Sequence, residues 1–258
     1  MIHIKSPQEI LTMKKAGKIL GEVLETVMNS IEEGMTELEI DSLAERLIRE
    51  KGGESGFKKV PGYHHTICIS VNDVVVHGIP TERKVNKGDI IGVDCGVYLD
   101  GFHTDMAETI LLPLGNKSDE EKKKFLKAGK DALFNAIFQV KAGNRVGDVS
   151  IQMQNVEKMG YSIVKSLVGH GVGRDLHEDP EIPGFLAKPI RKTPLFKENM
   201  TVAVEIIYNM GSEEIVYSGE DDWTIVTKDK NLSGLFERSM IVTKNGPELL
   251  TRFSTDPV

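Results

Sequence analysis

The stretch VDCGVYLDGFHTD, residues 93–105, predicts two antiparallel strands joined by a tight turn. Its centre is Asp100-Gly101, which strand-forming residues flank on both sides, and a two-residue type I′ turn needs a positive φ at both positions. This turn places Leu99 opposite Phe102, and the pairing then runs outward along both strands. We therefore expect a hairpin with a defined register.

Two carboxylates lie on one face of this predicted hairpin. In the expected register Asp94 pairs with Ala107 and Asp105 pairs with Gly96, and side chains alternate between the two faces of a strand. Asp94 and Asp105 are then diagonal neighbours, roughly 6–8 Å apart at Cβ. Because two buried carboxylates repel each other, we expect a proton or a cation between them.

The composition is that of an ordinary globular protein, since 40% of the 258 residues are hydrophobic and 28% are charged. The net charge of −7 argues against a general nucleic-acid binder and against an anionic-membrane binder. Neither a membrane-spanning apolar run nor the apolar core of a signal peptide is found. We expect a cytoplasmic protein in which Cys68 and Cys95 are buried, reduced thiols.

Capping signals and apolar periodicity predict four helices. SPQE at 6–9 and TELE at 36–39 are capping boxes, the first with proline at the initial helical position. SDEE at 118–121 opens a third helix, and a fourth covers roughly 148–159. Strands are expected at 66–71, 90–98, 102–112, 162–167, 200–209, 222–227 and 236–243.

A faint internal repeat relates the two halves of the chain. IEEGMTELEI at 31–40 resembles VKAGNRVGDV at 140–149, and each copy is preceded by a long helix and followed by a second helix and strands. The matched pairs are Ile31/Val140, Gly34/Gly143, Glu39/Asp148 and Ile40/Val149. We therefore predict one α+β domain over residues 1–258, with pseudo-twofold halves of roughly 1–115 and 116–258 and a site where they meet.

The glycine-rich stretch SLVGHGVGRDLHEDP at 166–180 does not predict a dinucleotide-binding loop. Leu176 stands where a third glycine is required, and HEDPEIPG at 177–184 predicts a loop where a helix should follow. We interpret the glycines as letting the backbone crowd around His170 in a turn, with His177 further along. A histidine in that setting, in a chain with stranded acids, is a candidate metal ligand.

Two further acids interrupt apolar strands. Glu205 lies in MTVAVEIIYNM and Glu237 lies in LFERSMIVT, although glutamate is rarely buried unless it is paired. One interpretation is a structural salt bridge, for which Arg238 stands beside Glu237. The other is a metal site, because these glutamates and the two aspartates of the hairpin carry four negative charges, which two divalent cations neutralise and one does not. Carboxylates with one imidazole suit Mn²⁺, Fe²⁺, Co²⁺ or Zn²⁺, and a bound metal lowers the pKa of water toward neutrality.

The candidate ligands and one histidine segment resemble a known family. Asp94, Asp105, His170, Glu205 and Glu237 are similar, in order and spacing, to the five metal ligands of the methionine aminopeptidases. SVNDVVVHGIP at 70–80 resembles the strand and loop that carry a catalytic histidine, here His77. The resemblance covers nearly the whole chain and implies a pita-bread fold, an antiparallel sheet backed by two pairs of helices. The chain lacks a zinc-finger extension and an inserted helical subdomain, so it is similar to a minimal, bacterial-style type I enzyme.

The resemblance implies a role for each ligand. Asp105 and Glu237 would bridge two divalent metal ions (Co, Mn, Fe or Zn), Asp94 would chelate one ion, and His170 with Glu205 would hold the other. The free α-amine of the substrate would bind a metal, which would restrict cleavage to the first residue. The expected activity is removal of the N-terminal methionine from peptides and nascent proteins, with a transient ribosome contact left open and a monomer expected.

The resemblance also implies catalytic and pocket residues. Glu205 would move the proton from water to the leaving amine, His77 would contact the scissile amide and His177 would steady the oxyanion. The residues that match the methionine pocket are Tyr63, Cys68, His77 and Trp223, with Phe57 at its entrance.

The chain departs from the family pattern at four positions. Val60 stands where tyrosine is common and His64 where proline is common, while Ile206 and Arg238 follow two of the ligands in place of the usual proline and histidine or aspartate. These departures predict altered specificity or slower turnover. The alternatives are a related peptidase with another preference, such as Xaa-Pro, and a non-catalytic binding protein. The HGIP context opposes the first alternative, and retention of all five candidate ligands opposes the second.

Overall fold

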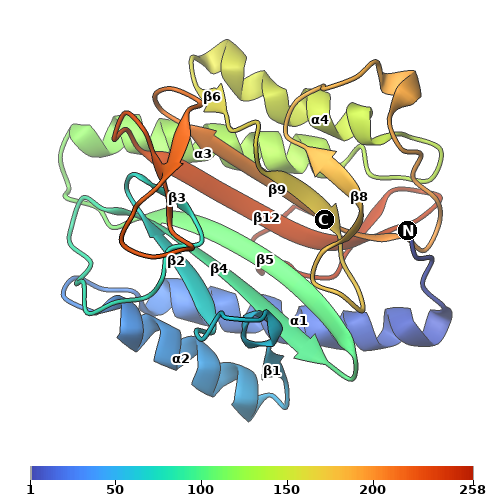
Figure 1. Ribbon diagram of the computed structural model, residues 1–258, viewed down its shortest axis with the longest axis horizontal. Helices are drawn as coiled ribbons and strands as arrows, with labels where there is room; N and C mark the ends of the chain where they lie inside the picture. The colour runs from blue at the N-terminus through green and yellow to red at the C-terminus, as the bar shows by residue number, and fades with distance from the viewer. Residues whose placement is uncertain (1, 258) are drawn as a thin grey trace.

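The computed structural model describes residues 2–257, in which ten strands form one antiparallel sheet (Figure 1). The strand order is β1-β4-β5-β12-β9-β7-β8, with β2 beside β4, β6 beside β9 and β13 beside β12. β10, β11 and β3 form a separate small sheet. The strands are β1 Glu54–Ser55, β2 Ile67–Val71, β3 Val74–Val76, β4 Ile90–Leu99, β5 Phe102–Leu111, β6 Ser162–Ile163, β7 Val168–Gly171, β8 Glu178–Pro183, β9 Thr201–Asn209, β10 Ile215–Tyr217, β11 Ile225–Thr227, β12 Ser233–Val242 and β13 Pro247–Leu249.

Two pairs of helices cover one face of the large sheet, which we call the helix face (Figure 1). They are α1 Pro7–Ser30 with α2 Glu37–Glu50, and α3 Ser118–Ile137 with α4 Val146–Gln154. The first pair packs on β2, β4 and β5 around one apolar core, and the second pair packs on β9 and β12 around another. The predicted α+β class, with an antiparallel sheet and two helix pairs, is confirmed.

The hairpin register predicted from the turn is confirmed. Leu99 pairs with Phe102, and the ladder continues with Asp94 opposite Ala107. The turn residues Asp100 and Gly101 have φ of 47° and 90°, as a type I′ turn requires. One local turn therefore fixes which face of ten-residue strands carries the acids.

The internal repeat corresponds to equivalent local structures. Gly34 and Gly143 have φ of 92° and 97°, a region that glycine adopts without a steric penalty. After each of them the second helix of a pair begins, and an acid in its first turn accepts from the N–H of the N-cap residue: Glu39 from Thr36 at 2.7 Å and Asp148 from Arg145 at 2.7 Å. The pseudo-twofold relation is thus present in the backbone, whereas the boundary near residue 115 stays a prediction.

Several predicted elements were wrong. The segment predicted as a loop at 177–184 contains β8, and His170 lies in β7 rather than in a turn. Prolines at positions 180 and 183 favoured a loop, yet β8 is an edge strand, where the missing N–H group of proline is tolerated. The fourth helix ends at Gln154 and continues as a 3₁₀ turn, the strand predicted at 222–227 begins only at Ile225, that at 162–167 ends at Ile163, and β3 and β10 were not expected.

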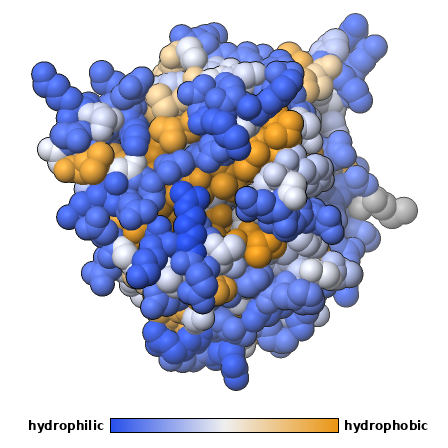
Figure 2. All heavy atoms as spheres, turned by 60° about the vertical axis from the view of Figure 1, so that its left-hand side comes forward, coloured by the Kyte–Doolittle hydropathy of each residue, from blue (hydrophilic) through white to orange (hydrophobic). Residues whose placement is uncertain are grey.

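Hydrophobic side chains occupy a minor part of the surface in the view of Figure 2. There they lie mainly in a hollow that hydrophilic side chains surround. Within residues 2–257 no helix combines the length and the apolar character needed to cross a membrane.

Candidate active site

A row of five residues crosses the sheet in register, on the face opposite the helices. Alternation along β9 puts its even-numbered residues in the helix-face core, so Glu205 points to the other face, which we call the site face. The paired residues of this row are Cys68, Asp94, Ala107, Glu237 and Glu205. Three acids from β4, β12 and β9 therefore lie along one line.

A second row lies two residues further along the same strands. Asp105 of β5 is on the same face as Ala107, and its N–H donates to Ser239 Oγ at 3.0 Å. Ser239 pairs with Ala203, which pairs with His170 of β7. The two rows together bring all five predicted metal ligands to the middle of the site face.

The centre of this cluster is compact. Ligand atoms of Asp105, His170 and Glu237 lie within 4.8 Å of one another. His170 Nε2 is 3.9 Å from Asp105 Oδ2 and also 3.9 Å from Glu237 Oε1. His170 Nδ1 lies 2.9 Å from the Gly171 carbonyl oxygen, an acceptor that only an Nδ1–H group can satisfy. The neutral ring then directs the lone pair of Nε2 at the carboxylates, the orientation of a metal-binding imidazole.

Burial and mutual repulsion disfavour the charged forms of these acids. Burial, followed by the charges of Asp105 and Glu205, raises the pKa of Asp94 well above its usual range. Burial and the neighbouring carboxylates raise the pKa of Glu237 in the same way. Burial raises the pKa of Asp105 to about 7, and burial with the charge of Asp105 raises that of Glu205 to about 8. The cluster therefore requires bound protons or cations near neutral pH.

The chemistry of the cluster fits divalent metal ions. Asp94 Oδ1 is buried and has no hydrogen-bond partner within the described part of the chain. The side chain of Arg238, which the salt-bridge interpretation assigned to these acids, pairs instead with Glu108 and Asp256. Within residues 2–257 no lysine or arginine forms an ion pair with the cluster, so two divalent cations can neutralise its four carboxyl groups, with the neutral imidazole as a further ligand.

Two further histidines line the same cavity as the predicted ligands. His77 follows β3 with φ of 57°, a left-handed conformation that costs free energy and often marks functional sites. The His177 ring centroid is 4.4 Å from that of His170. Burial lowers the pKa of His177, and burial together with His177 lowers the pKa of His77. Both imidazoles are therefore neutral near pH 7 and can donate a hydrogen bond.

An apolar pocket opens beside the acids. Phe57, Tyr63, Cys68 and Leu176 form its buried part, and Trp223 packs edge-on against Tyr63 with ring centroids 5.2 Å apart. The hydroxyl of Tyr63 donates to the Ile67 carbonyl oxygen at 2.7 Å, so no polar group of that ring is left unpaired. Burial raises the pKa of the Cys68 thiol, which stays neutral. Cys68 and Cys95 are both free and buried, as predicted.

One cavity of about 290 Å³ contains every predicted site residue. The predicted members are Phe57, Tyr63, Cys68, His77, Asp94, Asp105, His170, His177, Glu205, Trp223 and Glu237. The residues that sequence reasoning missed are Val76, Ser166, Leu167, Val168, Leu176 and Ile207. Ile207 was accessible to prediction, since it lies two residues after Glu205 on the same face of β9.

The four departures from the family pattern lie in different places. Val60 lines the cavity, whereas His64 is exposed and does not. Ile206 belongs to the apolar core of the helix face, and the buried side chain of Arg238 pairs with Glu108 and Asp256 behind the sheet. Two of the four departures, Ile206 and Arg238, therefore lie behind the predicted ligands and do not line the cavity.

Comparisons with known proteins agree with this geometry. Residues 12–243 match the description Metallopeptidase family M24. The chain is 42% identical to the methionine aminopeptidase of Clostridium perfringens, over 97% of this chain and 99% of that protein. It is 40% identical to methionine aminopeptidase 1 of Bacillus subtilis, over 98% of this chain and 100% of that protein. The crystal structure of the Thermotoga maritima methionine aminopeptidase superposes with a TM-score of 0.92 at 37% identity. The superposition covers 98% of this chain and 100% of that one.

Proposed function

The chain belongs to metallopeptidase family M24, and on that premise we propose that it removes the N-terminal methionine from peptides and nascent proteins. The observation that carries the proposal is one cavity in which carboxylates and histidines adjoin an apolar pocket. An unbranched, polarisable methionine side chain suits such a pocket, which the aromatic rings of Phe57, Tyr63 and Trp223 line together with the Cys68 thiol.

The order of the strands supports a division of the ligands between two metal ions. Asp105 and Glu237 lie on the adjacent strands β5 and β12, in the middle of the cluster. Asp94 lies on one side of them, on β4, while Glu205 and His170 lie on the other side, on β9 and β7. Two divalent ions, when bound, would supply Lewis acidity and lower the pKa of water, and Co, Mn, Fe and Zn all suit this donor set.

The chain's own residues then handle the protons and the developing charge. Glu205 accepts the proton of the attacking water and returns it to the leaving amine. The neutral ring of His177 donates a hydrogen bond to the oxyanion, and His77 contacts the scissile amide. Each of these side chains lines the same cavity. A ribosome contact, a cytoplasmic location and a monomeric state remain predictions.

A cleavage assay tests the proposed function directly. We expect release of methionine from Met-Ala-Ser, detected by mass spectrometry, with Leu-Ala-Ser and Ala-Pro-Ser left intact. The activity should disappear after chelation and return when Mn²⁺, Co²⁺ or Fe²⁺ is added. Equal rates on the methionine and leucine peptides would contradict a methionine pocket, and cleavage of Ala-Pro-Ser would support the Xaa-Pro alternative.

The stabilising effect of a metal should increase with pH. The folded pKa of Asp105 is raised from 3.8 to about 7 and that of Glu205 from 4.5 to about 8. Their protonated forms therefore stabilise the metal-free fold fully below about pH 4, and this contribution is lost as the pH rises to about 8. A divalent ion replaces the protons, so Mn²⁺ should raise the melting temperature by several degrees more at about pH 8 than at about pH 5. Differential scanning fluorimetry measures both shifts, and equal shifts would contradict this linkage.

A further inference from the structure

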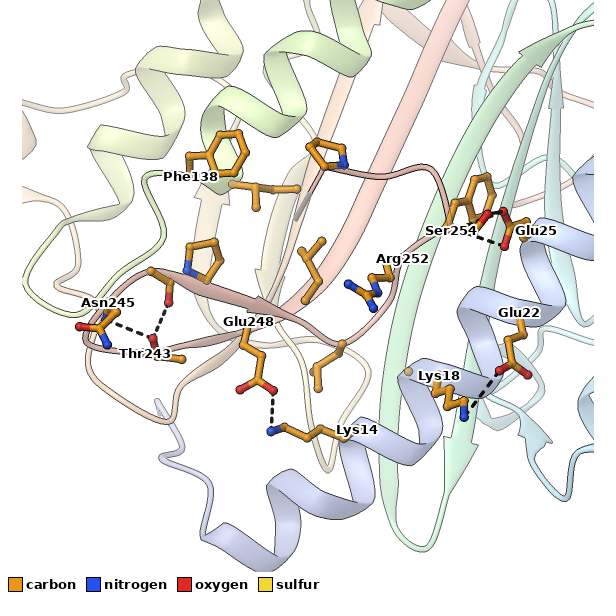
Figure 3. A pocket seen from close by; sticks show the side chains of 18 residues that line it. Lys14, Lys18, Glu22, Glu25, Phe138, Thr243, Asn245, Glu248, Arg252 and Ser254 are labelled. Atoms are coloured by element: carbon orange, nitrogen blue, oxygen red, sulfur yellow. Dashed lines mark hydrogen bonds and ion pairs between the residues drawn. The ribbon is translucent and has the colours of Figure 1, made fainter.

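The C-terminal segment, residues 247–257, begins as β13 beside β12 and then runs along the helix face, against α1 and Arg238. Figure 3 shows this tail between α1 and the end of α3, with Glu248 turned toward Lys14 and Ser254 toward Glu25. These two contacts are made by partly exposed side chains at the edge of the segment. The buried part of the tail makes different contacts, which reach the strands that carry Asp105 and Glu237.

The main chain of the tail lies in a groove that two glycines of α1 create. A Cβ atom on Gly17 would lie 2.3 Å from the Leu250 carbonyl oxygen, and one on Gly21 would lie 2.5 Å from the Arg252 carbonyl oxygen. Any larger residue at these positions would displace the tail backbone. The backbone of the tail therefore packs directly against α1, and this contact fixes the position of the tail between α1 and the sheet.

The tail supplies hydrogen bonds where the ladder between β5 and β12 ends. These strands pair at Ala107–Glu237 and Met106–Arg238, and at the next position the Ser239 hydroxyl bonds both backbone groups of Asp105.

Thr251 from the tail completes this junction. Its hydroxyl accepts from the Ser239 N–H at 2.8 Å and donates to the Asp105 carbonyl oxygen at 3.4 Å. The N–H groups of Leu250 and Thr251 both donate to the Ser239 carbonyl oxygen. The backbone of Asp105 is thus held by two hydroxyl groups, one of which belongs to the tail.

A second connection runs from the tail to Glu237. The Asp256 carboxylate accepts from Arg238 Nε at 2.7 Å and from Nη2 at 3.1 Å. Arg238 Nη1 in turn donates to the carbonyl oxygens of Glu237, at 2.8 Å, and Ala107, at 3.0 Å. Asp256 and Arg238 are both buried, so this chain of contacts is shielded from solvent.

We propose that the C-terminal tail positions the metal centre, with Thr251 holding the backbone of Asp105 and Asp256 holding that of Glu237 through Arg238. Thr251, Asp256 and Arg238 are positioning residues, since none of them lines the cavity. The inference rests on the proposed function, in which Asp105 and Glu237 would hold divalent metal ions in the middle of the cluster. Loss of a group that orients a metal ligand typically lowers metal affinity about 10- to 100-fold.

The test is a calorimetric titration of the full-length, metal-free protein with Mn²⁺. Thr251→Val keeps the shape of the side chain and removes the hydroxyl, so its Mn²⁺ affinity should fall about 10- to 100-fold. Thr251→Ser should restore most of the affinity, which a purely steric effect would not do. Ser254→Ala is the matched control, because Ser254 is an exposed residue of the same tail and its hydroxyl donates to Glu25 of α1, not to Asp105 or Ser239. Circular dichroism verifies that each variant is folded at the temperature of the titration.

The outcomes separate the two levels of the proposal. Wild-type protein that binds no Mn²⁺ would contradict the proposed function itself. Wild-type binding with an unchanged affinity in folded Thr251→Val, or an equal loss in Ser254→Ala, would overturn the role of the tail. Should Thr251→Val fail to fold, Asp256→Asn decides: weaker Mn²⁺ binding supports the proposal and unchanged binding overturns it.

Discussion

Replacing Asp105 by Asn is expected to lower methionine release from Met-Ala-Ser at least about 10³-fold and to reduce the number of bound Mn²⁺ ions below two. Asn keeps the size of the side chain but lacks the charge needed to bridge two cations, and a metal contributes several kcal/mol to transition-state stabilisation. The metal-free variant should also be at least as stable as wild type, because the substitution removes one of four mutually repelling carboxyl groups.

The control for this prediction is Asp131→Asn. Asp131 is a partly exposed residue of α3 that pairs with Lys127, so its charge can be removed far from the cavity. Cleavage rate, Mn²⁺ stoichiometry and melting temperature are measured for both variants. An Asp105→Asn protein that keeps two Mn²⁺ ions and its activity would exclude Asp105 as a bridging ligand.

Replacing Arg238 by Met is expected to lower the free energy of unfolding by about 3–5 kcal/mol, measured by urea denaturation. Arg238 is completely buried and pairs with Glu108 and Asp256, which are themselves buried. Removal of the guanidinium leaves two carboxylates in a low-dielectric environment, where the partly exposed Lys130 lies beside both. The cost therefore arises mainly from the unpaired acids and not from the lost pair itself.

Neutralising the acids tests that explanation. The triple variant Arg238→Met, Glu108→Gln, Asp256→Asn should recover most of the lost stability, because no buried charge is then left uncompensated. Wild-type stability in the single variant would show that the buried network contributes nothing. A triple variant no more stable than the single one would assign the loss to the packing of the Arg238 side chain instead.

Local signals predicted that the acids of the hairpin share one face of the sheet. Asp100-Gly101 fixes the register of one hairpin, and alternation then places Asp94 and Asp105 on the same face. The glutamates were recognisable because each interrupts a buried, β-branched run. Each of these predictions needed only a short stretch of sequence and the alternation of side chains between the two faces of a strand.

Features that depend on distant pairing could not be predicted. β8 was missed because its prolines are compatible with a strand only at a sheet edge, a property set by the whole topology. Arg238 was offered as a partner for Glu237, yet adjacent residues of a strand point to opposite faces, and its partners are 130 and 18 residues away. The role proposed for Thr251 likewise depends on where β5 and β12 separate, and the sequence around Thr251 contains no signal for that position.

The location and number of the bound metal ions are tested most directly by anomalous diffraction at the manganese absorption edge, from crystals of the wild-type protein grown with Mn²⁺. We expect two anomalous peaks in the cavity, both in contact with Asp105 and Glu237, one beside Asp94 and the other beside His170 and Glu205. A map with no peak among these five residues, or with manganese only elsewhere on the molecule, would contradict a dinuclear metallopeptidase centre at this site.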